Sequence, residues 1–241
     1  MKDLLRIIGE RRTLLFFDLE ATQITHECIE IGAYRVTLKD DLSVKKIFKP
    51  YHAYVRPKHR IGSVVTKLTG ITEKTIADKG ISYREMLGGL QKYLGKEFGK
   101  CLFVCYGDQD PRILQASCEN NMDAPRDVSR FVSRHCFDFE AFTGRFVRDE
   151  KGNYLSLSHI CELFGLDFEG TAHGAQADAK NLLNLYSAFL SHKDIVQREY
   201  EMILARGNNV PPPVKAVLDR LNKGQTVTPE DYRRIVGEHL K

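Results

Sequence analysis

The distribution of apolar residues along the chain predicts a sheet of five strands. "TLLFF" is an almost continuous apolar run, which is typical of a central strand covered on both faces. The second predicted strand alternates in polarity, and the third is rich in aromatic and β-branched residues, with Pro50 favouring an edge or a bulge. Strands are predicted over residues 13–17, 27–38, 46–57, 101–107 and 134–139.

Between and after these strands, apolar residues recur at the three- and four-residue spacing of helices. Ser82 and Glu85 have the pattern of a capping box, and Pro111 after Asp110 marks the first position of another helix, with Asp110 as its N-cap. Helices are predicted over residues 2–9, 63–80 (broken at Gly70), 83–94, 110–121, 140–147, 157–164 and about 175–191. This order indicates an α/β fold, a mixed sheet with helices on its faces.

The character of the chain changes after Ser191. The segment "NNVPPPV" (208–214) is a stiff, proline-rich break, and two apolar stripes at helical spacing follow it. Thr228 and Pro229 have the pattern of an N-cap and a first helical residue. We therefore predict a main domain over residues 10–192 and a small extension of two or three helices over 193–241.

Composition is that of an ordinary globular protein, with 241 residues of which 42% are hydrophobic and 28% charged. The net charge of +4 permits an anionic partner without requiring one. Six cysteines without CxxC spacing argue against a zinc cage and are expected to be mostly buried free thiols, which favours a reducing compartment. The N-terminal segment has neither a signal peptide nor a membrane span, so we expect a cytosolic protein without a membrane partner.

Two acids, Asp18 and Glu20, end the first predicted strand. Residues two apart point to the same side of a strand, so both carboxylates share one face with Leu14 and Phe16. Two like charges at the end of a buried strand repel each other and need compensation. The alternative is that the strand has simply reached its exposed end, where acids are harmless.

Two more acids occupy comparable places. Asp110 follows an apolar strand, where open α/β sheets tend to build their sites, although an Asp that only caps a helix is equally compatible with the sequence. Asp178 extends an apolar stripe of the 175–191 helix, although the helix N-terminus alone also favours a negative charge there. His173 is expected on the loop that enters this helix, with Gly174 giving the backbone its freedom.

Taken together, these residues are four carboxylates and one histidine from three segments. Carboxylates with water and phosphate oxygens form octahedral Mg²⁺ or Mn²⁺ sites. Two such ions can clamp the attacking and leaving oxygens of a phosphodiester, and a histidine can take the proton of the attacking water. The combination therefore indicates phosphodiester hydrolysis.

Three segments, "FDLEAT" (17–22), "YGDQD" (106–110) and "HGAQAD" (173–178), resemble the three motifs of DEDDh 3′–5′ exonucleases, the DnaQ-like group on a ribonuclease H-like fold. "HECIEIGAYRV" and "LTGIT" resemble the family's second strand and the segment after its third. The "DLEAT" and "GDQD" forms are most similar to the exoribonuclease subgroup that includes histone-mRNA and small-RNA trimming enzymes and bacterial KapD-like proteins. The resemblance covers roughly residues 12–190.

This resemblance implies a role for each matching residue. His173 would be the general base, and Glu20, Ala21 and His173 would contact the terminal nucleotide. Asp110 is preferred to Asp108 because the family's second acid stands where the following helix starts, while Gln109 departs from the aromatic residue that relatives often carry. The implied ligands of two Mg²⁺ or Mn²⁺ ions are Asp18, Glu20, Asp110 and Asp178.

The sequence thus predicts a metal-dependent 3′–5′ exonuclease that releases nucleoside 5′-monophosphates, with single-stranded RNA 3′ ends as the preferred substrate. A DNA exonuclease of proofreading or repair type remains an alternative. A catalytically silent nucleic-acid-binding module that kept the fold is another. The 193–241 extension resembles no known motif, and a protein or RNA contact is its expected role.

Overall fold

The computed structural model describes residues 2–170, 173–206 and 210–240. The predicted proline-rich break starts at residue 208, outside these ranges. In chain order the elements are α1 (Lys2–Ile8), β1 (Thr13–Ala21), β2 (Cys28–Leu38), β3 (Val44–Ile47), β4 (Tyr51–Tyr54), α2 (Ser63–Thr69), α3 (Glu73–Lys79), α4 (Tyr83–Leu94), the 3₁₀ helix η1 (Gly95–Lys100), β5 (Leu102–Cys105), α5 (Gln109–Asn120), α6 (Arg126–Arg134), β6 (Cys136–Asp138), α7 (Phe139–Thr143), α8 (Leu157–Leu163), α9 (Ala175–Ser191), α10 (Lys193–Arg206), α11 (Pro212–Asn222) and α12 (Pro229–His239).

The chain divides into two compact units. The first contains Met1–Ala141 and Ser156–Ser191, and the second contains Phe142–Leu155 and His192–Lys241. The second unit therefore includes a segment from within the predicted main domain, and the predicted domain ranges stay a prediction. No helix in the described part of the chain is both long and apolar enough to cross a membrane.

The sheet of the first unit has six strands rather than the predicted five. Its order is β3-β2-β1-β5-β6, with β4 also pairing with β2. The strand predicted over 46–57 is in fact two short strands, β3 and β4, which are both antiparallel to β2. They are interrupted around Pro50, which has no backbone N–H to donate to the ladder. The predicted α/β class with a mixed sheet is confirmed, because β1 pairs antiparallel with β2 and parallel with β5.

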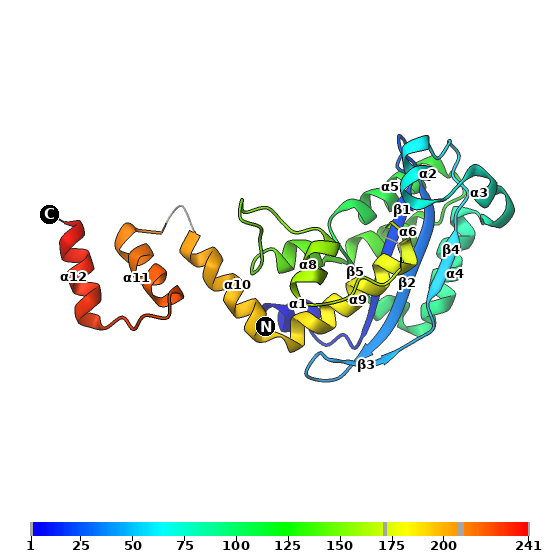
Figure 1. Cartoon of the computed structure of the whole chain (residues 1–241). Coiled ribbons are helices and arrows are strands. Elements are labelled where there is room, and N and C mark those ends of the chain that lie inside the picture. The colour runs from blue at the N-terminus through cyan, green and yellow to red at the C-terminus, as the bar shows by residue number, and fades with distance from the viewer. Residues whose placement is uncertain (1, 171–172, 207–209, 241) are drawn as a thin grey trace. The chain divides into compact units, whose positions relative to one another are not determined.

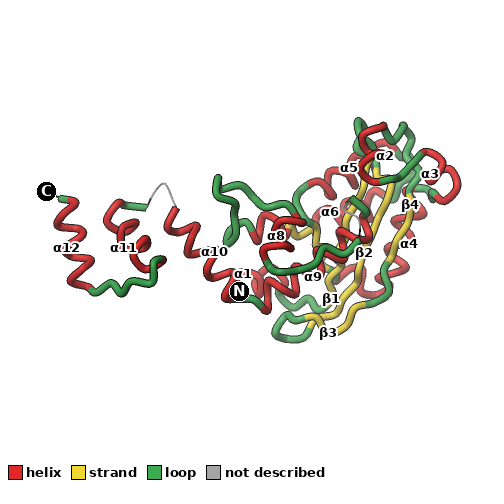
Figure 2. Tube along the Cα trace, in the orientation of Figure 1, coloured by secondary structure: helices red, strands yellow, loops and turns green. Residues whose placement is uncertain are grey.

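Strand β1 lies in the middle of the sheet and is covered on both faces (Figures 1 and 2). Leu15 and Phe17 pack into a core built with residues of α4, α5 and α6. Phe16 points to the opposite face, where its ring lies 5.1 Å from that of Tyr186 in α9. The alternation predicted for this strand is therefore confirmed, and it fixes Asp18 and Glu20 on the face covered by α9.

Helix α9 approaches β2 very closely at Gly32. A Cβ atom on Gly32 would lie 2.2 Å from the backbone nitrogen of Gln176, which is in the first turn of the helix. The absence of a side chain is thus what lets the helix start directly over the sheet. Gly32 is also the residue paired with Asp18 across the β1–β2 ladder.

Two features of the α5–α6 region differ from the prediction. Helix α5 begins at Gln109 with Asp108 at the N-cap position, so Asp110 lies inside the first turn and is not the N-cap. Pro111 still fits there, because the first turn needs no intrahelical N–H donors. Helix α6 has no counterpart among the predicted elements, since its buried positions Val128 and Val132 form only a short apolar stripe.

The second unit has a helical core of its own. Phe146 packs edge-to-face on Tyr200 of α10, with ring centroids 5.5 Å apart. Helices α11 and α12 pack on each other, and Arg220 lies 4.0 Å from Asp231. The predicted start of α12 is confirmed, because the Thr228 side chain accepts from the backbone of Asp231 in a capping box.

We expect Gly32→Ala to destabilise the protein by about 2 kcal/mol, because the added methyl group must displace the backbone of α9. Urea unfolding followed by circular dichroism would measure this change. Gly88→Ala is the matched control: Gly88 is an exposed helical glycine with open space around it. There the same substitution should add roughly 0.5–1 kcal/mol. Equal effects at both positions would contradict the close approach.

Candidate active site

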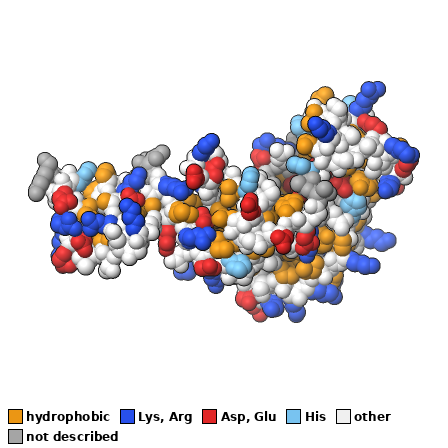
Figure 3. Space-filling view, in the orientation of Figure 1, with side chains coloured by type: hydrophobic (Ala, Val, Ile, Leu, Met, Phe, Trp, Pro, Cys, Tyr) orange, Lys and Arg blue, Asp and Glu red, His pale blue; other side chains and the backbone are white. Residues whose placement is uncertain are grey.

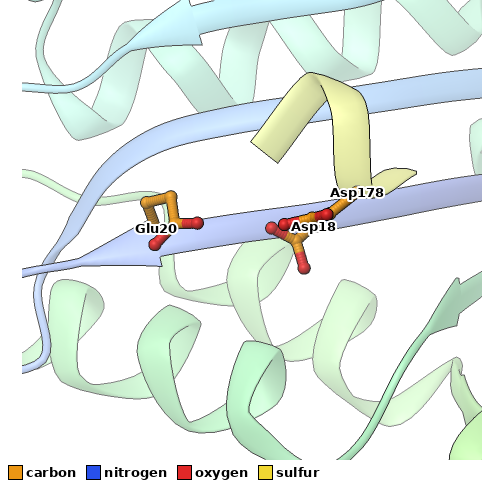
Figure 4. Close-up of side chains that lie close together, drawn as sticks. All are labelled: Asp18, Glu20 and Asp178. Atoms are coloured by element: carbon orange, nitrogen blue, oxygen red, sulfur yellow. The ribbon is translucent and has the colours of Figure 1, made fainter. Parts of the chain in front are cut away.

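Three carboxylates converge where β1 meets the start of α9. Asp18 and Glu20 are supplied by the strand and Asp178 by the first turn of the helix (Figure 4). One carboxylate oxygen from each lies within 4.8 Å of the other two. The predicted stripe of Asp178, Leu182 and Leu185 explains this position, since both leucines are buried against the sheet. Acids 160 residues apart in the sequence therefore share one site.

Burial and mutual repulsion disfavour the ionised form of these carboxylates in the absence of a cation. Burial raises the pKa of Asp18 well above its ordinary value, and the neighbouring charges of Asp110 and Glu20 raise it further. Burial, with the charges of Asp178 and Glu30, raises the pKa of Glu20 to about 7. A site with this electrostatic profile favours a bound cation.

Asp110 stands beside this cluster without joining it. Its side chain is 3% exposed, and its Oδ1 accepts a hydrogen bond of 2.8 Å from the backbone N–H of Leu19, between the two acids of β1. Burial raises the pKa of Asp110 to about 8, although this hydrogen bond opposes the shift. Asp108, by contrast, is exposed and forms an ion pair with Arg112. The neighbour of the cluster is therefore Asp110 rather than Asp108.

His173 lies on the loop just before α9, as predicted, and is exposed. Its backbone N–H donates to Oδ2 of Asp178 over 3.1 Å, which opposes the effect of burial on the pKa of Asp178. The sequence predicted backbone freedom at Gly174, and the left-handed conformation in this loop is found at His173, with a φ of 65°. A non-glycine residue in this conformation is uncommon, and such residues cluster at active sites.

Ala21 ends strand β1, next to the acids. The pairing of β1 with β2 shifts between Glu20 and Ala21, so Ala21 is paired with Cys28. Such an irregularity bends the strand and re-aims the side chains around it. The residue is partly exposed and directly follows a member of the acidic cluster.

Glu30 is a further acid at this site that the sequence analysis did not single out. It lies opposite Glu20 in the ladder and is 6% exposed. Its Oε2 accepts from the backbone N–H of Ala175 over 3.1 Å, and its Oε1 lies 2.6 Å from Nε2 of His52. Glu30 thus ties the first residue of α9 to β2. Glu30 is two residues before Gly32 and therefore lies on the same face of β2. This position in the sequence could have indicated that Glu30 belongs to the site.

Comparison with known proteins agrees with this geometry. The profile of the Exonuclease (RNase_T) family matches residues 15–186, which include every residue of the acidic site. The chain belongs to this exonuclease family. The resemblance to DEDDh exonucleases is therefore confirmed at the level of the family. Helices α10 to α12 lie beyond the matched region.

Similar members of the exonuclease family include two curated proteins. The 3′-5′ exonuclease Snipper of Drosophila melanogaster is 31% identical over 175 residues, which are 65% of this chain and 58% of Snipper. The 3′-5′ exonuclease eri1 of Schizosaccharomyces pombe is 27% identical over 212 residues, which are 75% of this chain and 68% of eri1. The present chain thus matches less than two thirds of the length of Snipper.

Among solved structures, the nuclease domain of 3′hExo, a DEDDh family member bound to rAMP, superimposes with a TM-score of 0.60. The identity is 21%, and the match covers 78% of this chain and 96% of that domain. At this identity the likeness establishes a shared fold. The ribonuclease H-like architecture predicted from the motifs is confirmed by it.

The raised pKa values predict how pH affects the metal-free protein. Glu20 and Asp110 have folded-state pKa values of about 7 and 8, above the 4.5 and 3.8 expected when unfolded, so the folded state binds more protons. The stability that these two groups contribute is then fully present below about pH 4 and is lost as the pH rises to about 8. Urea unfolding in EDTA should show a loss on the order of 2 kcal/mol between pH 5 and pH 8.5.

Two variants separate this effect from general charge. Glu20→Gln removes one repelled carboxylate and should reduce the pH dependence to the part due to Asp110, whereas Asp108→Asn removes an exposed acid and should leave it as in the wild type. Adding Mg²⁺ or Mn²⁺ at pH 8 should restore stability to the wild type, because the cation binds only the folded cluster. A stability that does not change with pH in EDTA would contradict the electrostatic account.

Proposed function

We propose that this chain is a metal-dependent 3′–5′ exonuclease that hydrolyses the terminal phosphodiester of a nucleic acid and releases nucleoside 5′-monophosphates, with RNA preferred. The observation that carries the proposal is the half-buried cluster of Asp18, Glu20 and Asp178, in which one carboxylate oxygen of each residue lies within 4.8 Å of the other two. Membership of the exonuclease family supports the same reaction.

The donor set fits a hard divalent cation. Its oxygens are carboxylates only, which Mg²⁺ and Mn²⁺ prefer. Burial, with the charges of Asp178 and Glu30, raises the pKa of Glu20, and a bound cation would oppose that shift. We assign two metal ions to Asp18, Glu20 and Asp178 together with the adjacent Asp110. Bound ions of this kind supply Lewis-acid stabilisation of the attacking and leaving oxygens.

The residues of the chain supply the remaining functions. His173 is the proposed general base, because an imidazole accepts protons near neutral pH and this one is exposed beside Asp178. Glu20, Ala21 and His173 would contact the terminal nucleotide, at the end of β1 and the start of α9. Glu30 would hold the N-terminus of α9, and with it Asp178, in register with the strand.

RNA is the proposed substrate because the ligand bound in the 3′hExo nuclease domain is a ribonucleotide, rAMP. Single-stranded RNA 3′ ends are the proposed partner. The cytosol is the proposed compartment, since all six cysteines are free thiols. For the segment 193–241 we propose an accessory contact with protein or RNA.

Asp18→Asn tests the reaction. Loss of this proposed ligand should reduce nucleotide release from a 3′-labelled RNA strand roughly 10³-fold, because binding of the catalytic metal is impaired. Release is measured with Mn²⁺, with Mg²⁺ and in EDTA. Asp108→Asn, the matched control on an exposed acid, should keep activity near that of the wild type. A wild-type protein without metal-dependent release on any single strand would leave only the silent binding module.

A comparison of matched RNA and DNA strands tests the preference. Both strands carry the same sequence and 3′ label, and initial rates are measured at equal concentrations below saturation. We expect several-fold faster release from RNA, through contacts that include its 2′-hydroxyl groups. Faster release from DNA would make the DNA exonuclease the correct alternative.

A further inference from the structure

A groove lies between helices α5 and α6 of the first unit. The two helices are held together at Leu114, whose carbonyl oxygen accepts from the hydroxyls of Tyr83 over 2.9 Å and of Ser129 over 3.2 Å. The exposed side of this junction encloses about 410 Å³. The charged residues that line it are Arg112, Arg126, Arg130, Arg134 and Glu119.

The lining is strongly basic, with four arginines and one acid. Elsewhere, on the face drawn in Figure 3, basic and acidic side chains are interspersed. Arg126, Arg130 and Arg134 are four residues apart, so they form one stripe along α6, here called the arginine stripe. All three are exposed, and within the described ranges none of them forms an ion pair with an acid.

An unpaired stripe of this kind has a cost in the free protein. Like charges four residues apart in a helix repel and destabilise it by a few tenths of a kcal/mol per pair. A polyanion would remove that repulsion. The guanidinium group has a planar fork of donors that matches phosphate oxygens. The stripe extends about 12 Å along the helix axis, so it can contact more than one phosphate.

The groove continues toward the active site. A second cavity of about 420 Å³ shares Arg112, Gln115 and Glu119 with the first and also reaches Gln109. Gln109 is the neighbour of Asp110, which is hydrogen-bonded to the strand that carries the acidic cluster. The two cavities thus adjoin along α5, and together they reach from the arginine stripe to the residue that precedes Asp110.

We propose that the arginine stripe binds the phosphodiester backbone of the substrate strand, upstream of the nucleotide held at the active site. This inference rests on the proposed function, since it assigns the rest of the same nucleic acid to a second surface. Phosphate contacts position a strand without reading its sequence. The stripe therefore supplies affinity for longer strands, whereas a very short oligonucleotide would occupy only the active site.

The triple variant R126Q/R130Q/R134Q tests the proposal. Glutamine keeps the helix propensity and part of the stem of each side chain while removing its charge. Binding of a 20-nucleotide oligo(U) RNA is measured in EDTA, so that no hydrolysis is needed. We expect Kd at 50 mM salt to rise about 10-fold or more, and the slope of log K against log salt to fall by about 2 for three lost contacts.

K45Q/K46Q/K49Q is the matched control. It removes the same charge from exposed residues near β3, at the opposite edge of the sheet from β6. This control should bind the 20-nucleotide strand nearly as the wild type does. Equal losses of affinity in the two triple variants would mean that only the net charge of the protein matters for binding. Wild-type affinity in the stripe variant would mean that the groove binds something other than RNA, such as an acidic protein. Either result overturns the proposal.

Activity on a trinucleotide separates the two proposals. The stripe variant should hydrolyse a trinucleotide with kcat/KM within about twofold of the wild type, while kcat/KM on the 20-nucleotide strand falls in proportion to the lost affinity. A wild type that binds the long strand through the stripe but hydrolyses neither substrate would refute the exonuclease function alone. Thermal melting verifies that the triple variant is folded. If it is unfolded, the three single variants replace it in the binding measurement, and each is expected to lose part of the affinity.

Discussion

Repulsion among half-buried carboxylates is the constraint on which the architecture of the first unit depends. Asp18, Glu20 and Asp178 would move apart if their backbones allowed it. They are kept together because β1 is the central strand of the sheet, packed on both faces, and because α9 starts directly over β2. Gly32 permits that approach and Glu30 accepts from the first N–H of the helix. The scaffold thus holds three carboxylates close together against their mutual repulsion.

Much of this arrangement could be predicted from local patterns. The alternation of β1 placed its two acids on one face, and the spacing of Leu182 and Leu185 placed Asp178 on the buried side of α9. These inferences succeeded because helix and strand periodicities depend on backbone geometry alone. The prediction of free, mostly buried cysteines was confirmed, since all six are free thiols and only Cys118 and Cys136 are partly exposed.

The errors in the prediction arose where tertiary contacts decide the outcome. Glu30 appears as the polar member of an alternating strand, and only the helix that covers it makes it a buried acid. The sequence 46–57 has strand-like composition throughout, yet Pro50 interrupts the ladder and yields two strands. Helix α6 was missed because only Val128, Phe131 and Val132 anchor it, too few apolar residues for a clear helical pattern. The arginine stripe lies on this helix.

The origin of the acids in distant parts of the chain has a consequence for the newly made protein. A ribosome adds residues from the N-terminus at roughly 5–20 per second, so Asp18, Glu20 and Asp110 exist well before Asp178. Until α9 has been synthesised and has docked on β2, the acidic cluster lacks the carboxylate of Asp178. For a chain proposed to degrade RNA, this order means that the nascent polypeptide is catalytically incomplete until α9 has been made and has docked.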